Sequence, residues 1–178
     1  MSATADQQIK ALVDLHRWRD VLPLVTSELA TRPDDPDLHG WRAQAAVGTA
    51  DWPTALESAN RLVMLAPDRD WGHRLASIAL DRMGRAHEAV RAAREAVRLA
   101  PHLWHGHMQL AQAAVDVRGG MPEALQAANE AVRLGPNEAD THFTLGLVHQ
   151  RNRQTAAART AYERALALDP DHAMARNN

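Results

Sequence analysis

The segment RTAYERALALDP (159–170) has three counterparts earlier in the chain: LESANRLVMLAP (56–67), VRAAREAVRLAP (90–101) and LQAANEAVRLGP (125–136). Each segment has a leucine two places before its final proline. Together with Pro33, these prolines lie 34, 34, 35 and 34 residues apart. A nearly constant period of this length indicates a repeat architecture, in which each copy forms one supersecondary unit.

Each of these segments is predicted to be an amphipathic helix. Small or aliphatic residues recur at i, i+7 and i+10 and therefore lie on one helical face. They are Ala55, Leu62 and Leu65; Ala89, Ala96 and Leu99; Ala124, Ala131 and Leu134; and Ala158, Ala165 and Leu168. The proline ends each helix because it disfavours a helical conformation of the residue before it.

A second helix precedes each of these segments. In DTHFTLGLVHQ (140–150), His142, Leu145, Gly146 and His149 fall at i, i+3, i+4 and i+7 and form a single stripe. The third place of this stripe is small in every copy, and its residues are Ala43, Ser77, Ala111 and Gly146. We therefore expect the two helices of each copy to pack closely and antiparallel to each other.

These patterns resemble the tetratricopeptide repeat family, and the last copy matches the family pattern most closely, with Leu145–Gly146, Ala158, Tyr162, Ala165 and Pro170. The resemblance implies an all-α fold, a right-handed α-solenoid of stacked antiparallel helix pairs. We expect a single domain over 1–178. Its repeats are predicted at about 5–35 (degenerate), 36–69, 70–103, 104–138 and 139–172, with 173–178 beginning a further helix.

Two details of the terminal copies give further expectations. Pro23 lies within the second helix of the first copy, which predicts a kink or a late start for that helix. At the other end, an unpaired last helix would leave an apolar face exposed, which predicts possible self-association through the C-terminal repeat.

The composition excludes several classes of function. With no cysteine, thiol catalysis, disulfides and Cys-ligated zinc are excluded. A formal net charge of −2 gives no reason to expect nucleic acid as a partner. No apolar run approaches membrane-spanning length, and the N-terminal residues do not resemble a signal peptide. We therefore expect a cytoplasmic protein with no direct membrane insertion.

The segment PHLWHGH (101–107) contains three histidines, which raises the question of a metal site. His107, however, falls in register with His39, His73 and His142, at a place where the family usually has a large aromatic residue. The favoured interpretation is half-buried, neutral, hydrogen-bonded histidines; a metal site and a pH sensor remain as alternatives. We predict no metal and no cofactor.

No motif for an enzymatic reaction is present, so the chain is not expected to be an enzyme. Gly119 and Gly120 are interpreted as a turn. Arg91, Arg94 and Arg98 recur at helical spacing beside glutamates, which favours a salt-bridged outer face over a nucleic-acid patch.

The resemblance implies a concave surface, lined by the first helix of each repeat, that binds extended or helical peptides. By register, its candidate residues are Trp71, Arg74, Ile78, Arg82, His105, Met108, Gln112, Phe143, Leu147 and Arg151. The apolar members are predicted to face solvent, where aromatic and arginine side chains commonly act as hot spots. The alternative is incidental exposure or packing against a neighbouring repeat.

One specific family function is tested by the same register. Family members that grip chaperone C-terminal carboxylates use Lys and Asn four apart, then Asn, then Lys and Arg four apart. The matching places here are Asp6, Lys10, Gly40, Gln44, Arg74 and Ile78, so a carboxylate clamp is not expected.

The sequence therefore predicts a non-catalytic scaffold that binds a protein or peptide in its groove. The alternative is a regulatory or anchoring domain of a larger enzyme or membrane protein. The identity of the partner is not encoded in a recognisable motif.

Overall fold

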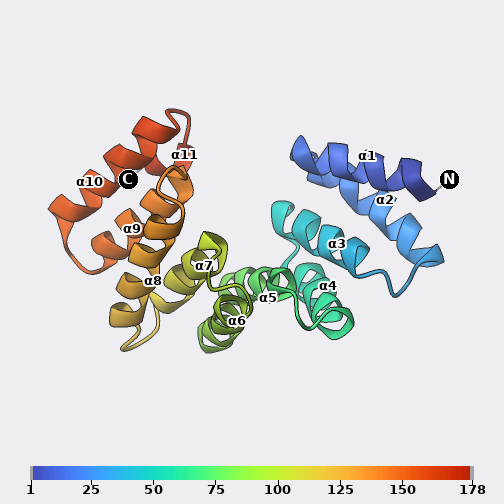
Figure 1. Ribbon diagram of the computed structural model, residues 1–178, viewed down its shortest axis with the longest axis horizontal. Coiled ribbons are helices and arrows are strands. Elements are labelled where there is room, and N and C mark those ends of the chain that lie inside the picture. Colours follow the sequence, from blue (N-terminus) through green and yellow to red (C-terminus); the bar gives the residue numbers. More distant parts are fainter. Residues whose placement is uncertain (1, 177–178) are drawn as a thin grey trace. The chain divides into compact units, whose positions relative to one another are not determined.

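The computed structural model describes residues 2–176, and within that range every regular element is an α-helix. The chain divides into two compact units, residues 1–85 and 86–178. Figure 1 labels the helices. The first unit contains α1 (Ser2–Asp14), α2 (Trp18–Thr31), α3 (Pro36–Gly48), α4 (Trp52–Leu65) and α5 (Asp70–Arg82). The second contains α6 (Ala86–Leu99), α7 (Trp104–Ala114), α8 (Met121–Leu134), α9 (Ala139–Arg151), α10 (Thr155–Leu168) and α11 (Ala173–Arg176).

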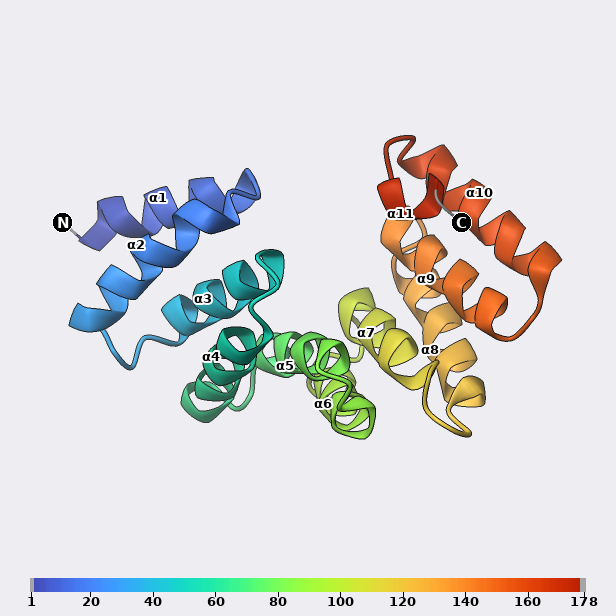
Figure 2. The ribbon, with the colours of Figure 1, turned by 180° about the vertical axis from the view of Figure 1, so that it is seen from behind.

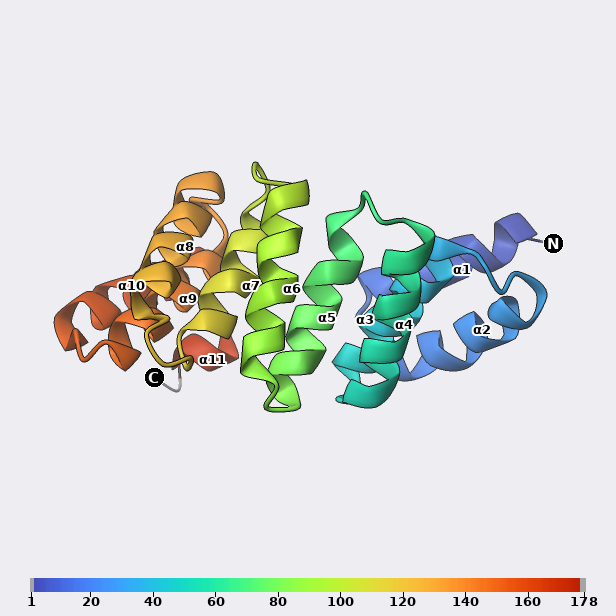
Figure 3. The same ribbon diagram turned by 90° about the horizontal axis from the view of Figure 1, so that it is seen from below.

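Consecutive helices pack against each other within each unit. In the first unit, α1 packs on α2, α2 on α3, α3 on α4 and α4 on α5 (Figure 2). In the second unit, α6 and α7 lie side by side, and α7–α8 and α9–α10 form pairs (Figure 3). The predicted all-α class of stacked helix pairs is confirmed, whereas the description as one domain stays a prediction.

Local sequence explains where the helices begin and turn. Asp35 caps α3 by accepting hydrogen bonds from the backbone N–H groups of Asp37 and Leu38, and Asp51 caps α4 through Thr54. The turn between the two helices of each repeat contains one residue with positive φ. These residues are His16, Ala50, Gly84, Gly119 and Arg153. A left-handed residue at the same place reverses the chain in every copy.

The helix α2 runs from Trp18 to Thr31 with Pro23 inside it. It begins five residues before the proline, so the expected late start is not observed. The N-cap position is Arg17, whose side chain makes no capping bond. An uncapped helix with an internal proline fits the degenerate character predicted for this first copy.

The composition of the core changes along the chain. Around α1, α2 and α3 the core consists mostly of branched side chains, and its buried residues are Ile9, Val13, Val21, Val25, Leu38 and Ala45. In the second unit, the fully buried residues of α6, α7 and α8 are alanines: Ala89, Ala93, Ala96, Ala111, Ala124, Ala128 and Ala131. Alanine at these places allows the helix backbones to approach closely, as the sequence pattern predicts.

The small residue of the last copy lies against an aromatic ring. A Cβ atom added to Gly146 would come within 2.5 Å of the Tyr162 ring on α10. The glycine therefore makes room for a tyrosine of the partner helix. Among the described helices, none has both the length and the apolar character needed to cross a bilayer.

Candidate functional site on the A helices

The first helix of each repeat is called an A helix here, and the A helices are α1, α3, α5, α7 and α9. Within the first unit, α3 and α5 pack together through two tryptophans. The ring centroids of Trp41 and Trp71 lie 4.9 Å apart, and the rings are inclined by 70°. Trp71 also covers Gly40, where an added Cβ would approach the ring to 2.2 Å. Trp71 therefore packs against a neighbouring repeat, which is the alternative that the sequence left open.

The two arginines predicted on α5 are also engaged within the unit. The guanidinium of Arg74 donates to Asp70 at 2.6 Å, and both side chains are mostly buried. Arg82 is partly exposed and lies over the Trp52 ring, 5.9 Å from its centroid, in a cation–π contact. Arg74 is thus neutralised internally, whereas Arg82 keeps an accessible charge. Ile78 is half-buried on the same helix.

A small cavity of about 270 Å³ opens beside α1 and α3 in this unit. Its lining is largely charged, with one indole ring, and consists of Asp6, Lys10, Asp35, Asp37, Leu38 and Trp41. The sequence did not single out Trp41 as a groove residue. It lies one place after Gly40, which matches Arg74 in register, so it falls outside the predicted groove positions.

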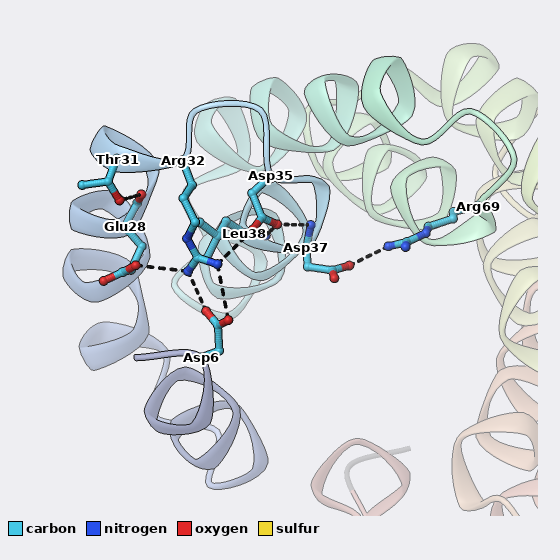
Figure 4. A network of polar contacts seen from close by, with 8 residues as sticks. All are labelled: Asp6, Glu28, Thr31, Arg32, Asp35, Asp37, Leu38 and Arg69. Carbon is cyan, nitrogen blue, oxygen red and sulfur yellow. Dashed lines mark hydrogen bonds and ion pairs between the residues drawn. The ribbon is translucent and has the colours of Figure 1, made fainter. Parts of the chain in front are cut away.

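The acidic side chains near this cavity are organised around Arg32 (Figure 4). Its guanidinium donates to Asp6 at 2.6 Å, to Glu28 at 3.1 Å and to Asp35 at 3.1 Å. The hydrogen bonds from Arg32 lower the pKa of Asp6 below its usual value and raise the pKa of Arg32. Asp37 pairs separately with Arg69 across the link to α5. These ion pairs tie α1, α2 and the start of α3 together.

In the second unit, a polar bond fixes α7 beside α9. The side-chain amide of Gln112 donates to the hydroxyl of Thr144 at 2.9 Å. Met108 and Leu147 each lie one turn from this bond, on α7 and α9, and both are half-buried. Arg151, which is exposed, forms an ion pair with Asp116. Here apolar side chains remain partly accessible beside a fixed polar contact.

Two other predicted residues of this unit have neighbours of their own. His105 is half-buried and stacks on Trp104, with ring centroids 3.6 Å apart. Phe143 is only 7% exposed, so the expectation that it faces solvent is wrong. Its ring lies 5.7 Å from that of Tyr162 and 5.1 Å from that of His172, and it packs in one cluster with Ala175 of α11. The sequence pattern could not show that α11 covers this position.

The histidines that recur in register make the same hydrogen bond in three of the repeats. His39, His107 and His142 each place Nε2 within 2.8–3.0 Å of the carbonyl oxygen of the proline six residues earlier. A carbonyl only accepts, so Nε2 carries the hydrogen in each ring. The interpretation as hydrogen-bonded histidines is confirmed for these three residues. Each ring satisfies a carbonyl of the link that enters its own helix.

His172 makes a related arrangement at the C-terminal end. Its Nε2 donates to Asp140 at 2.9 Å, and its Nδ1 accepts from the backbone N–H of Ala175 at 3.2 Å. One ring thus joins α9 to the start of α11. In the part of the chain that the structure describes, no group of three or more His, Asp or Glu side chains is arranged to hold a metal ion.

The outer arginines of α6 all form ion pairs, two within the helix and one with α8. Arg98 pairs with Glu95 at 2.8 Å, and Arg94 forms two bonds of 2.8 Å with Glu123 of α8. Arg91 forms a longer ion pair with Glu88, at 3.8 Å, which is too long for a hydrogen bond. The salt-bridged interpretation is therefore confirmed for all three arginines, although the partner of Arg94 lies on another helix.

Two family models, each described as tetratricopeptide repeat, match residues 75–139 and 139–172. None of the curated proteins matches the sequence significantly.

Several solved structures share the fold. TTC0263, a thermophilic TPR protein of Thermus thermophilus, is 20% identical with a TM-score of 0.87, over 99% of this chain and 96% of that chain. MamA from Desulfovibrio magneticus RS-1 is 16% identical with a TM-score of 0.71, over 96% of each chain. YrrB, described as a TPR protein with an unusual peptide-binding site, is 15% identical with a TM-score of 0.65, over 95% of this chain and 87% of that chain. At these identities the likeness shows the fold alone.

Proposed function

Because this chain belongs to the tetratricopeptide repeat family, we propose that it is a non-catalytic scaffold that binds a peptide or protein segment along its A helices. The coarser part of this proposal, a protein-interaction module, is typical of the family. A structural neighbour, YrrB, is described as having a peptide-binding site, which supports the same role here.

The observation that carries the proposal is the α7–α9 face of the second unit. Met108 and Leu147 remain half-exposed, although each helix has other apolar residues that fill its core. The Gln112–Thr144 bond holds the two helices together, so the backbone positions that carry these side chains are set before a partner binds. A preorganised apolar surface loses little conformational entropy on binding, which favours affinity. A helical or extended segment could bury one or two apolar side chains there.

The candidate residues contribute unequally to this proposal. We keep Met108, Leu147, Gln112, His105 and Arg151 as the binding surface of the second unit. In the first unit, the accessible candidates are Ile78 and Arg82, together with the cavity beside Trp41. Trp71, Arg74 and Phe143 act through packing and internal pairing and are expected to support these surfaces rather than to contact a partner.

The test compares two charge-introducing double variants in affinity purification with the intact chain as bait. Met108→Glu with Leu147→Glu alters the α7–α9 face. The matched control, Met64→Glu with Leu103→Glu, alters exposed apolar residues elsewhere, which are 71% and 36% exposed. We expect partners of the unaltered chain to be lost with the first variant and kept with the second.

A partner found in this way is then reduced to the segment that binds, and its affinity is measured by calorimetry. Losing an apolar anchor commonly costs about 2 kcal/mol or more. If the first variant keeps every partner while the control loses them, binding occurs on another surface. Circular dichroism of both variants shows whether the helices remain folded.

A further inference from the structure

A cavity of about 590 Å³ lies on the second unit, away from the predicted groove residues. It is bordered by α6, the end of α7, the connection that follows α7 and the start of α8. Its charged and titratable lining residues are His87, Arg91, Arg94, Arg118 and Glu123. Three guanidinium groups therefore share the cavity with one carboxylate. We call this cavity the arginine pocket.

The single carboxylate of the pocket, that of Glu123, is paired with Arg94. Arg94 forms a two-bond fork with Glu123, with both distances 2.8 Å. These hydrogen bonds lower the pKa of Glu123 below its usual value, so this side chain stays ionised and paired at neutral pH. Arg94 is correspondingly held in a defined position by α8. Among the described residues, Glu123 pairs with Arg94 and with neither Arg91 nor Arg118.

The two remaining arginines have no close counter-ion among the lining residues. The Arg91 guanidinium lies 3.8 Å from a carboxylate oxygen of Glu88, and the Arg91 side chain is 67% exposed. Arg118 forms no ion pair or side-chain hydrogen bond with any residue in the described range 5–176. Two weakly neutralised guanidinium groups thus border one concavity, on α6 and on the α7–α8 connection. Guanidinium forks favour the planar, two-oxygen geometry of carboxylates.

We propose that the arginine pocket binds acidic side chains of a protein segment, with Arg91 and Arg118 as the groups that pair with them. It is a second contact surface for the proposed scaffold, independent of the α7–α9 face.

The charge of the whole chain favours a short acidic segment over a nucleic acid. The formal net charge is −2, so the overall field does not attract a long polyanion. Nucleic-acid binding usually requires many phosphate contacts, whereas this pocket offers the guanidinium groups of Arg91 and Arg118. A run of a few Asp or Glu residues needs only a local site. A phosphorylated serine in such a segment also presents anionic oxygens to the guanidinium groups, and a phosphoserine peptide distinguishes it from a run of carboxylates.

The experiment measures fluorescence anisotropy of a labelled peptide that contains a run of glutamates. The same peptide with glutamines in their place is the neutral control, and a third peptide carries one phosphoserine within the run. We expect the full chain to bind the glutamate peptide, with affinity that falls as salt rises, and to bind the glutamine peptide much more weakly. Tighter binding of the phosphoserine peptide would support the same pocket with phosphate as its preferred group.

Two double variants locate the site. Arg91→Glu with Arg118→Glu should weaken the glutamate peptide by about tenfold or more, because two pairs are lost and two repulsions are gained. Arg98→Glu with Arg133→Glu makes the same change in net charge at exposed arginines of α6 and α8 outside the pocket. This control should change the affinity by no more than about twofold.

Three outcomes would overturn the proposal. The first is unchanged affinity in the pocket variant, and the second is an equal loss in the control variant, which would indicate an effect of net charge. The third is a duplex oligonucleotide that binds more tightly than the peptide and displaces it. The Met108→Glu, Leu147→Glu variant should still bind the glutamate peptide, so failure of the pocket and failure of the α7–α9 surface are separable.

Discussion

The A-helix faces of the two units use the same register places for different purposes. Trp71 of the first unit and His105 of the second occupy equivalent places, one period of 34 residues apart. Trp71 spans two helices, because the preceding repeat has Gly40 beneath it. His105 instead stacks on Trp104, the residue next to it in its own helix. Side chains at equivalent groove places therefore pack differently: one lies against a neighbouring A helix, and the other lies against a residue of its own helix.

The largest expected effect tests this difference directly. Trp71→Ala should destabilise the first unit by about 3 kcal/mol, because it removes a large aromatic side chain from contacts with Trp41 and Gly40. Met108→Ala in the second unit should cost about 1 kcal/mol or less, since Met108 is half-exposed and not part of such a ring pair. Urea unfolding followed by circular dichroism measures both. Equal losses would mean that the two faces do not differ in the way described.

The next effect approaches the same contact from the other side. Gly40→Ala places a methyl group where the Trp71 ring lies, so the ring must move. We expect a loss of about 1–2 kcal/mol. Near-ultraviolet circular dichroism should change as well, because the Trp41–Trp71 pair is displaced. In the double variant Gly40→Ala, Trp71→Ala, the cost of the alanine at position 40 should nearly disappear; full additivity would contradict the proposed contact.

The fold was largely predictable because it depends on positions that recur. The alanine and leucine columns and the prolines specify helix faces and helix ends, and Ala55, Ala89, Ala124 and Ala158 are all buried as predicted. The site was less predictable because its properties depend on pairs from different repeats. Periodicity gives Phe143 and Met108 equivalent places, yet α11 covers only Phe143. Likewise, the spacing of Arg91 and Arg94 on α6 could not show that only Arg94 meets a carboxylate of α8.

Each unit also contains an ion pair whose contribution to stability is smaller and depends on pH. Arg32 lowers the pKa of Asp6 in the first unit, and Arg94 lowers the pKa of Glu123 in the second. A carboxylate with a lowered folded-state pKa contributes stability above its unfolded pKa, and this stability is lost as the pH falls through the folded-state pKa. Asp6→Asn and Glu123→Gln should therefore each flatten the acid side of the stability profile below about pH 5.

The two variants should lose slightly different amounts of stability. The Asp6 side chain is 53% exposed and that of Glu123 is 31% exposed, so solvent screens the first pair more strongly. We expect losses below about 1 kcal/mol at neutral pH for both, with the larger loss for Glu123→Gln. Unfolding measured at a series of pH values tests this order. A stability profile of either variant that parallels the unaltered chain at low pH would show that its pair does not contribute.

The smallest expected effect lies in the turns, where the two units again share one geometry with different residues. Ala50 and Gly84 of the first unit and Arg153 of the second occupy equivalent places, with φ of 60°, 74° and 60°. A left-handed conformation costs a residue with a Cβ about 1–2 kcal/mol. Glycine avoids this cost but loses more conformational freedom on folding, so its net advantage at such a place is smaller. Ala50→Gly, and Arg153→Gly in the second unit, should therefore raise stability by about 0.5 kcal/mol. Gly84→Ala, the reverse change, should lower it by about 0.5 kcal/mol. Nothing lies within 4 Å of a Cβ built at Gly84, so this cost would be one of backbone conformation alone. If Gly84→Ala melts at the same temperature as the unaltered chain, the left-handed residue is not what fixes these turns, and the gain expected at Ala50 would have no basis.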